Sequence, residues 1–168
     1  MKVRILSSDS VESAIDMPIA IETIRDGFAA LAVGRATVPV RVALETSHGV
    51  SLFMPAHLTE QDSASVMIVS VNEGNTKLGL PVIHAVIVVF DTLTGCPVAF
   101  MDGTWLTALR TGAVGGLAAD LLARKESKTV ALFGAGTQAR TQLEAVRCVR
   151  ALKKSELYLV LLSLQRIW

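Results

Sequence analysis

A glycine-rich turn places the strongest constraint on what this chain can fold into. Gly134, Gly136 and Ala139 form a G-x-G-x-x-A motif between an apolar segment at 129–133 and a helical pattern that continues to about residue 152. A strand that passes through such a turn into a helix is the setting in which the motif binds dinucleotides. The first glycine allows the tight turn, the second lets a pyrophosphate approach the backbone, and the alanine lets helix and strand pack closely. Free N–H groups at the helix N-terminus then face the phosphates. The alternative is a purely structural strand-to-helix turn.

The segment after this helix predicts a second strand over residues 157–164. In a dinucleotide-binding domain an Asp or Glu about 20 residues after the motif holds the cofactor ribose. That region is apolar here, with Leu159 near the expected position and Arg166 only several residues later. Two strands alone leave an unpaired edge and uncovered apolar side chains. We therefore expect the isolated chain to bind NAD(P)H poorly, and to self-associate around residues 157–164 or need a partner.

The region before the turn predicts an α+β domain. Strands are expected at 3–6, 38–44, 51–54, 66–71, 82–90 and 97–101. One helix begins near Asp16 and Pro18 and ends at Gly34, and a second covers 104–124. The polar stretch at 125–128 predicts a boundary between a domain of residues 1–125 and a partial Rossmann domain of residues 126–168. The fold class is therefore α/β: an α+β domain followed by the first βαβ unit of a Rossmann domain.

The second predicted helix contains four small residues, Gly112, Ala113, Gly115 and Gly116. Each glycine costs a helix about 1 kcal/mol relative to alanine. Residues without large side chains let another group approach the helix backbone. Two explanations stay open at this point, tight packing of another helix and a ligand that needs the space.

Composition narrows the class of protein further. Of the 168 residues 51% are hydrophobic and 18% are charged, which excludes a disordered chain. The net charge of +1 offers no electrostatic footprint for nucleic acid or an anionic membrane. No apolar run is long enough to span a bilayer, and the N-terminus does not read as a signal peptide. Cys96 and Cys148 alone signal neither a zinc site nor a disulfide framework, and no metal is expected. The expectation is a cytoplasmic globular protein.

Several motifs occur in the order of one known family. They are Arg41 after Pro39-Val40, Gly79-Leu80-Pro81, Asp102-Gly103-Thr104, Leu106-Thr107-Ala108-Leu109-Arg110-Thr111-Gly112-Ala113 and the glycine turn. In this order the chain resembles the ornithine cyclodeaminase/mu-crystallin family over about residues 3–155. The block containing Arg110, joined by about twenty residues to the glycine turn, makes the resemblance specific. Family chains are about twice as long, so the sequence looks like an N-terminal half.

The resemblance implies a subunit with a substrate-binding and dimerisation domain and a Rossmann domain for NAD or NADP. The shared chemistry is hydride transfer at a carbon that bears nitrogen, with a small amino or imino acid as substrate. Arg41 and Arg110 are expected to hold its carboxylate within one cleft, since a guanidinium fork suits that task. The resemblance assigns cofactor contacts to Thr111, Gly134, Ala135, Gly136, Thr137, Gln138 and Ala139. The acidic catalytic residue of the cyclodeaminases lies beyond this chain, so no catalytic residue is assigned.

Three departures from the family pattern bear on activity. Met67 stands where the family commonly has a Lys, Val82 follows Pro81 where a Thr is frequent, and Leu159 stands near the position of the ribose-binding acid. A thioether neither carries charge nor donates a hydrogen bond. Three hypotheses remain: an NAD(P)-dependent oxidoreductase or cyclodeaminase with impaired activity, a non-catalytic binding or dimerisation module with incomplete sites, and an inactive truncated product. In each case a homodimer or another self-associated form is expected.

Overall fold

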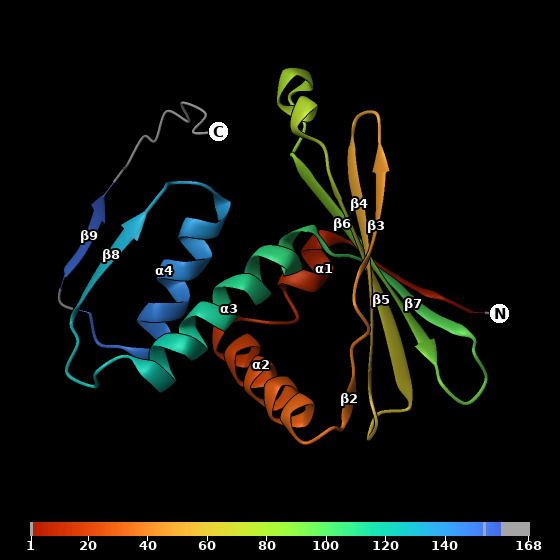
Figure 1. The fold of residues 1–168 in the computed structure, drawn as a ribbon, viewed down its shortest axis with the longest axis horizontal. Coiled ribbons are helices and arrows are strands. Elements are labelled where there is room, and N and C mark those ends of the chain that lie inside the picture. The colour runs from red at the N-terminus through yellow and green to blue at the C-terminus, as the bar shows by residue number, and fades with distance from the viewer. Residues whose placement is uncertain (1, 153, 159–168) are drawn as a thin grey trace. The chain divides into compact units, whose positions relative to one another are not determined.

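A computed structural model describes residues 2–152 and 154–158, the last five by their backbone alone. The chain divides into two compact units (Figure 1). The first unit contains Met1–Asp16 and Arg25–Thr107, and the second contains Met17–Ile24 and Ala108–Trp168. Because two helices contribute residues to both units, the division does not follow the sequence in one step. The predicted domain boundary at residues 125–126 stays a prediction.

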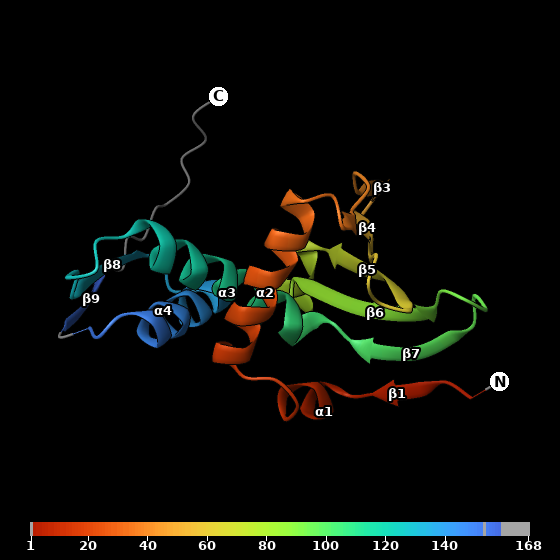
Figure 2. The same cartoon turned by 90° about the horizontal axis from the view of Figure 1, so that it is seen from below.

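A seven-stranded sheet forms the first unit. Its order is β1-β7-β6-β5-β4-β2, and β3 also pairs with β4. Every pairing is antiparallel except that of β1 with β7, which lie side by side in Figure 2. The strands are β1 (Arg4–Leu6), β2 (Ala36–Thr37), β3 (Val42–Thr46), β4 (Gly49–Leu58), β5 (Ser63–Val71), β6 (Ile83–Asp91) and β7 (Pro97–Asp102).

The centre of this sheet is the pair β5 and β6, whose β-branched residues favour extended backbone. Val69 lies opposite Ala85, and both are buried. Most other residues of β4, β5 and β6 are only half-buried. The short helix α1 (Ser8–Glu12) contacts β7, and Ser7 caps it by accepting a hydrogen bond from the Ser10 amide.

Several local features differ from the sequence prediction. The strand expected at 38–44 begins only at Val42, because Pro39 has no N–H to donate to a ladder. The segment expected as a loop contains a 3₁₀ helix, η1 (Glu73–Leu78), which ends at Gly79 with a φ of 68°. Helix α1 carries no apolar period and was not predicted. The class itself, a mixed α/β fold, is confirmed.

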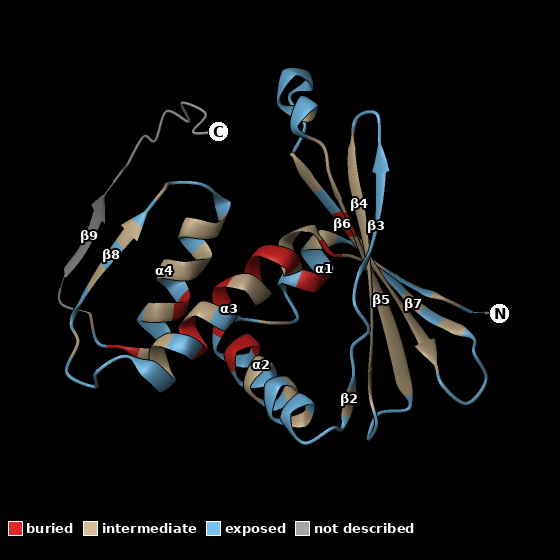
Figure 3. Cartoon of the chain, in the orientation of Figure 1, coloured by how far each residue is buried: buried red, intermediate tan, exposed pale blue. Residues whose placement is uncertain are grey.

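The second unit packs helices against a small parallel sheet. Its elements are the first half of α2 (Met17–Ala32), most of α3 (Thr104–Leu122), β8 (Thr129–Phe133), α4 (Thr137–Val149) and β9 (Lys154–Tyr158). Met17 and Leu109 are only 1% and 2% exposed, and Ala113 is fully buried. Figure 3 shows this burial following α3 and the start of α2.

Strand β9 begins at Lys154, three residues before the strand that we predicted. It pairs in parallel with β8, from Thr129 opposite Lys154 to Phe133 opposite Tyr158. Its first residues are polar, so a search for apolar runs misses them. The rest of the predicted strand, residues 159–164, lies outside the described residues.

Candidate functional site

The glycine turn joins β8 directly to α4. Gly134 has a φ of 97°, a left-handed conformation that L side chains rarely adopt, so the predicted requirement for glycine is met there. Gly136 is the N-cap of α4, with no side-chain capping hydrogen bond, and no acidic residue stands in the first turn. A Cβ on Gly136 would meet nothing within 4 Å. The N-terminus of α4 therefore has open space at Gly136, and no side-chain cap or acidic residue of the first turn compensates its amide dipoles.

Helix α3 lies closely beside α4, in both Figure 1 and Figure 2. A Cβ added to Gly112 would lie 2.6 Å from the carbonyl oxygen of Thr141, and one on Gly116 would lie 2.8 Å from the Cβ of Ala145. The two helices run in the same direction, because residues later in α3 meet residues later in α4. The small residues of α3 therefore serve helix packing. Of the two explanations that the sequence left open, the close approach of another helix is the one found, rather than a ligand that needs the space.

Arg110 and Gln138 are each half-buried and each carry a polar atom without a partner. Among the described residues, neither the buried Nε of Arg110 nor the buried Oε1 of Gln138 has a hydrogen-bond partner. Since Gly112 meets Thr141, the Arg110 segment of α3 lies at the same end of the helix pair as the first turn of α4. Burial lowers the pKa of the Arg110 guanidinium. An anionic group would supply the acceptor that the Nε of Arg110 lacks, whereas the Oε1 of Gln138 needs a hydrogen-bond donor.

The other predicted cofactor residues surround this end of the second unit. Ala135 and Thr137 are exposed, Thr111 and Ala139 are half-buried, and the amide of Ala139 donates to the Gly136 carbonyl at 3.0 Å. The backbone carbonyl of Thr111 accepts a hydrogen bond from Nε2 of Gln142 at 3.1 Å. The fold thus gathers Arg110, Thr111 and the glycine turn, and their roles toward a ligand stay predictions.

The remaining predicted positions belong to the first unit. Arg41 is exposed in the connection between β2 and β3. Met67 is half-buried on β5, between Met54 of β4 and Ile87 of β6. Val82 accepts a hydrogen bond from the Asn72 amide through its carbonyl, a contact that does not depend on its side chain. The shared cleft for Arg41 and Arg110 stays a prediction, and Leu159 lies outside the described residues.

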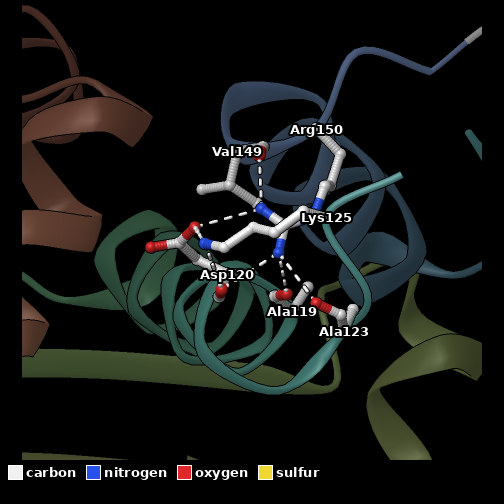
Figure 4. A network of polar contacts seen from close by, with 6 residues as sticks. All are labelled: Ala119, Asp120, Ala123, Lys125, Val149 and Arg150. Carbon is white, nitrogen blue, oxygen red and sulfur yellow. Dashed lines mark hydrogen bonds and ion pairs between the residues drawn. The ribbon is translucent and has the colours of Figure 1, made fainter. Parts of the chain in front are cut away.

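Arg150 is a structural residue that the sequence analysis missed (Figure 4). Its side chain is 7% exposed, and its Nη1 donates to Oδ1 of Asp120 at 3.0 Å and to the Val149 carbonyl at 2.7 Å. Its Nη2 donates to the carbonyls of Ala119, Asp120 and Ala123 at 2.8, 2.9 and 3.1 Å. The sequence offers no signal for this role, because the predicted helix continues to about residue 152 and so includes Arg150.

Within the described part of the chain, no group of three or more His, Cys, Asp or Glu residues could hold a metal ion. Helices long and apolar enough to cross a bilayer are likewise absent from residues 2–152 and 154–158.

Comparison with known sequences finds one family over nearly the whole chain. The sequence profile of the ornithine cyclodeaminase/mu-crystallin family matches residues 1–161. An alanine dehydrogenase of Archaeoglobus fulgidus is 43% identical over 149 residues, which are 89% of this chain and 46% of that protein. A Δ1-pyrroline-2-carboxylate reductase of Bacillus cereus is 31% identical over 156 residues, or 92% of this chain and 48% of that protein.

Solved structures give the same result. The Δ1-pyrroline-2-carboxylate reductase of Thermococcus litoralis, in complex with NADH and L-proline, superposes with a TM-score of 0.89 at 43% identity. The match covers 93% of this chain and 49% of that one. A lysine cyclodeaminase superposes with a TM-score of 0.83 at 35% identity, over 94% of this chain and 49% of that one. The chain thus spans about half the length of the relatives it matches.

Proposed function

Because the chain belongs to the ornithine cyclodeaminase/mu-crystallin family, we propose that it supplies the substrate-binding domain and the first βαβ unit of an NAD(P)-dependent oxidoreductase or cyclodeaminase acting on a small amino or imino acid. The observation that carries this proposal is the arrangement of polar groups around the N-terminus of α4. This N-terminus, which has no side-chain cap, lies at the same end of the helix pair as the Nε of Arg110, which has no hydrogen-bond partner among the described residues.

The residues present fit the phosphate part of a dinucleotide. The open space at Gly136 leaves room for an anion, and the first amides of α4 are suitable donors. Thr137 and Gln138 add a hydroxyl and an amide beside them. Relatives with matching structures hold NAD or NADH. When bound, the nicotinamide would accept or supply a hydride, while the residues of this chain hold and orient the cofactor and the substrate.

Arg110 is the residue that we assign to the substrate carboxylate. Its guanidinium is half-buried, and its Nε has no partner in the part of the chain that the structure describes. A carboxylate pairs with such a fork through two charge-assisted hydrogen bonds. Arg41 is assigned to the same ligand from the family pattern. A carboxylate held by arginines orients the carbon that bears nitrogen, and this orientation is the contribution of the chain to the chemistry.

Two substitutions at Gly136 test the phosphate site without disturbing the helix. Asn and Asp have nearly the same shape, both are good N-caps, and a side chain there meets no neighbour within 4 Å. Only Asp adds a negative charge against the phosphates. We expect saturation-transfer NMR to detect NADH bound weakly to the 168-residue chain. In Gly136→Asp the affinity should fall about 10-fold or more relative to Gly136→Asn.

Circular dichroism would establish that both variants stay folded. Equal NADH signals in the Asp and Asn variants, or no signal with any dinucleotide in the folded parent chain, would contradict the phosphate site.

A second candidate function is a non-catalytic module that associates with another copy of the chain. The sheet of the first unit favours this alternative, because its central strands are only half-buried among the described residues. Ile5 and Phe100, paired across β1 and β7, are exposed. A chain that dimerises but gives no saturation transfer to NADH or NADPH would support the module over the enzyme.

A further inference from the structure

The contact between α3 and α4 combines two kinds of interaction. Glycines determine how close the helices come, and polar contacts determine their relative position along the helix axis. Gly112, Gly115 and Gly116 bring the helices very close, since each lies against a residue of α4. Such small residues have no side chains that interlock with a facing groove, which is how packed helices normally resist sliding. The glycines therefore explain how near the helices are, and they leave the position along the axis to be set by something else.

Polar contacts can set that position. Gln142 donates to the Thr111 carbonyl near one end of the contact. At the other end Arg150 binds the carbonyls of Ala119, Asp120 and Ala123 and the Asp120 carboxylate. A guanidinium is a planar, rigid fork, so it meets this set of acceptors in only one arrangement. A slide of α4 by one residue along α3, about 1.5 Å, would break the set.

The cationic side chain also suits this location electrostatically. Arg150 is the C-cap of α4, and its guanidinium lies among the last carbonyls of α3. Helices that run in the same direction bring their negative C-terminal ends together, and a cation there stabilises both. A half-buried Asp120 completes the pairing of a charge that would otherwise be costly to bury.

We propose that Arg150 is a positioning residue, which fixes how far α4 is advanced along α3 and so places the glycine turn relative to Arg110 and Thr111. The functional importance of this distance rests on the proposed function, because the turn and Arg110 matter together only if they hold cofactor and substrate. The fixed register itself is a property of the two helices alone.

Spin labels on exposed positions of the two helices measure the register directly. Ala118→Cys on α3 and Glu144→Cys on α4 carry the labels, in a chain with Cys96→Ser and Cys148→Ser. Arg150→Lys keeps the charge but removes the fork, and Arg147→Lys makes the same exchange at an exposed position of α4. Double electron–electron resonance should show the distance distribution of Arg150→Lys shifted or broadened by about 1.5 Å or more. That of Arg147→Lys should coincide with the parent.

Asp120→Ala is the second variant, because it leaves Arg150 in place and removes one acceptor. The distance distribution of Asp120→Ala should also shift or broaden, by a smaller amount than that of Arg150→Lys. If Arg150→Lys does not fold, Asp120→Ala alone tests the proposal. A lower melting temperature with unchanged distances in both variants would overturn the proposal, since that is the result of a purely structural contact. Saturation transfer to NADH, several-fold weaker in folded Arg150→Lys, extends the test to function. If the parent chain shows no saturation transfer to NADH, the proposed function fails. The spin-label distances still test whether Arg150 fixes the position of α4 along α3.

Discussion

The two compact units reach order by different means (Figure 3). The first has long strands in continuous register, yet most residues of β4, β5 and β6 are only half-buried. The second has a sheet of just two described strands, and its helices contain Met17, Leu109 and Ala113, which are almost or fully inaccessible. Backbone hydrogen bonds between paired strands order the first unit, whereas close packing of buried side chains orders the second. The difference teaches that the extent of regular structure is a poor guide to where a chain has buried its apolar surface.

The largest expected effect concerns the assembly of the chain. We expect static light scattering after size exclusion to show at least two chains per particle, because exposed apolar residues such as Ile5 and Phe133 favour association (78% and 73% exposed). Calorimetry at micromolar concentration should then show no saturable binding of NADH or NADPH. A clean monomer that binds cofactor at micromolar concentration would contradict both this prediction and the expected weakness of a two-stranded nucleotide site.

Truncation of Leu109 tests the packed unit. Leu109→Ala removes a 2%-exposed side chain and should lower the free energy of unfolding by about 2–5 kcal/mol. Leu121→Ala on the same helix removes an exposed side chain and should change it by about 0.5 kcal/mol or less. Val66→Ala, on half-buried β5, should cost clearly less than Leu109→Ala in urea denaturation. Equal losses at Leu109 and Val66 would erase the contrast between the units.

Met67→Lys tests whether this position of the half-buried sheet binds a substrate. If Met67 replaces a substrate-binding Lys, the substitution should strengthen binding of L-alanine or L-proline by about 1.5–3 kcal/mol, the value of a charge-assisted hydrogen bond. Met54→Lys, opposite Met67 on the neighbouring strand, is the matched control and should bring no gain. Titration calorimetry measures both. An absence of gain at Met67 would mean that the position is misaligned or that the sheet binds no such ligand.

The smallest expected effect comes from replacing glycine by alanine in two different helices. Gly112→Ala places a Cβ 2.6 Å from the Thr141 carbonyl oxygen and should destabilise the chain by about 1–3 kcal/mol. Gly27→Ala, in α2, meets nothing within 4 Å and should stabilise it by about 0.5–1 kcal/mol. Thermal unfolding followed by circular dichroism gives both signs. A stabilising Gly112→Ala would show that α3 and α4 are not in close contact in solution.

Local chemistry explains why much of the fold could be predicted. Strands β5, β6, β7 and β8 were expected within a few residues, because β-branched residues cluster between clear turn signals such as Thr94-Gly95. The start of β9 was missed because Lys154 and Glu156 are polar, and the pairing with β8 rather than intrinsic preference makes this segment a strand. No local signal indicates that β1 pairs with β7, since that pairing depends on residues far along the chain.

The candidate site could be predicted only in part for the same reason. The glycine turn is contiguous, so its glycines, the helix start and the need for a left-handed residue at Gly134 are all readable from six residues. The contact between α3 and α4 joins residues about thirty positions apart, and nothing near Arg150 or Gln142 in the sequence points to their partners. The choice between helix packing and ligand space at Gly112 likewise required the position of Thr141.

The pairing of the first strand with the last strand of the sheet bears on how the protein is made. Arg4 lies opposite Ala99, so β1 leaves the ribosome 95 residues before its partner exists. At synthesis rates of about 5–20 residues per second, that interval is roughly 5–20 s. During it the N-terminal segment can form no native ladder, and closing so long a loop slows folding. The edge of the sheet that β1 forms is therefore completed only after β7 has been synthesised.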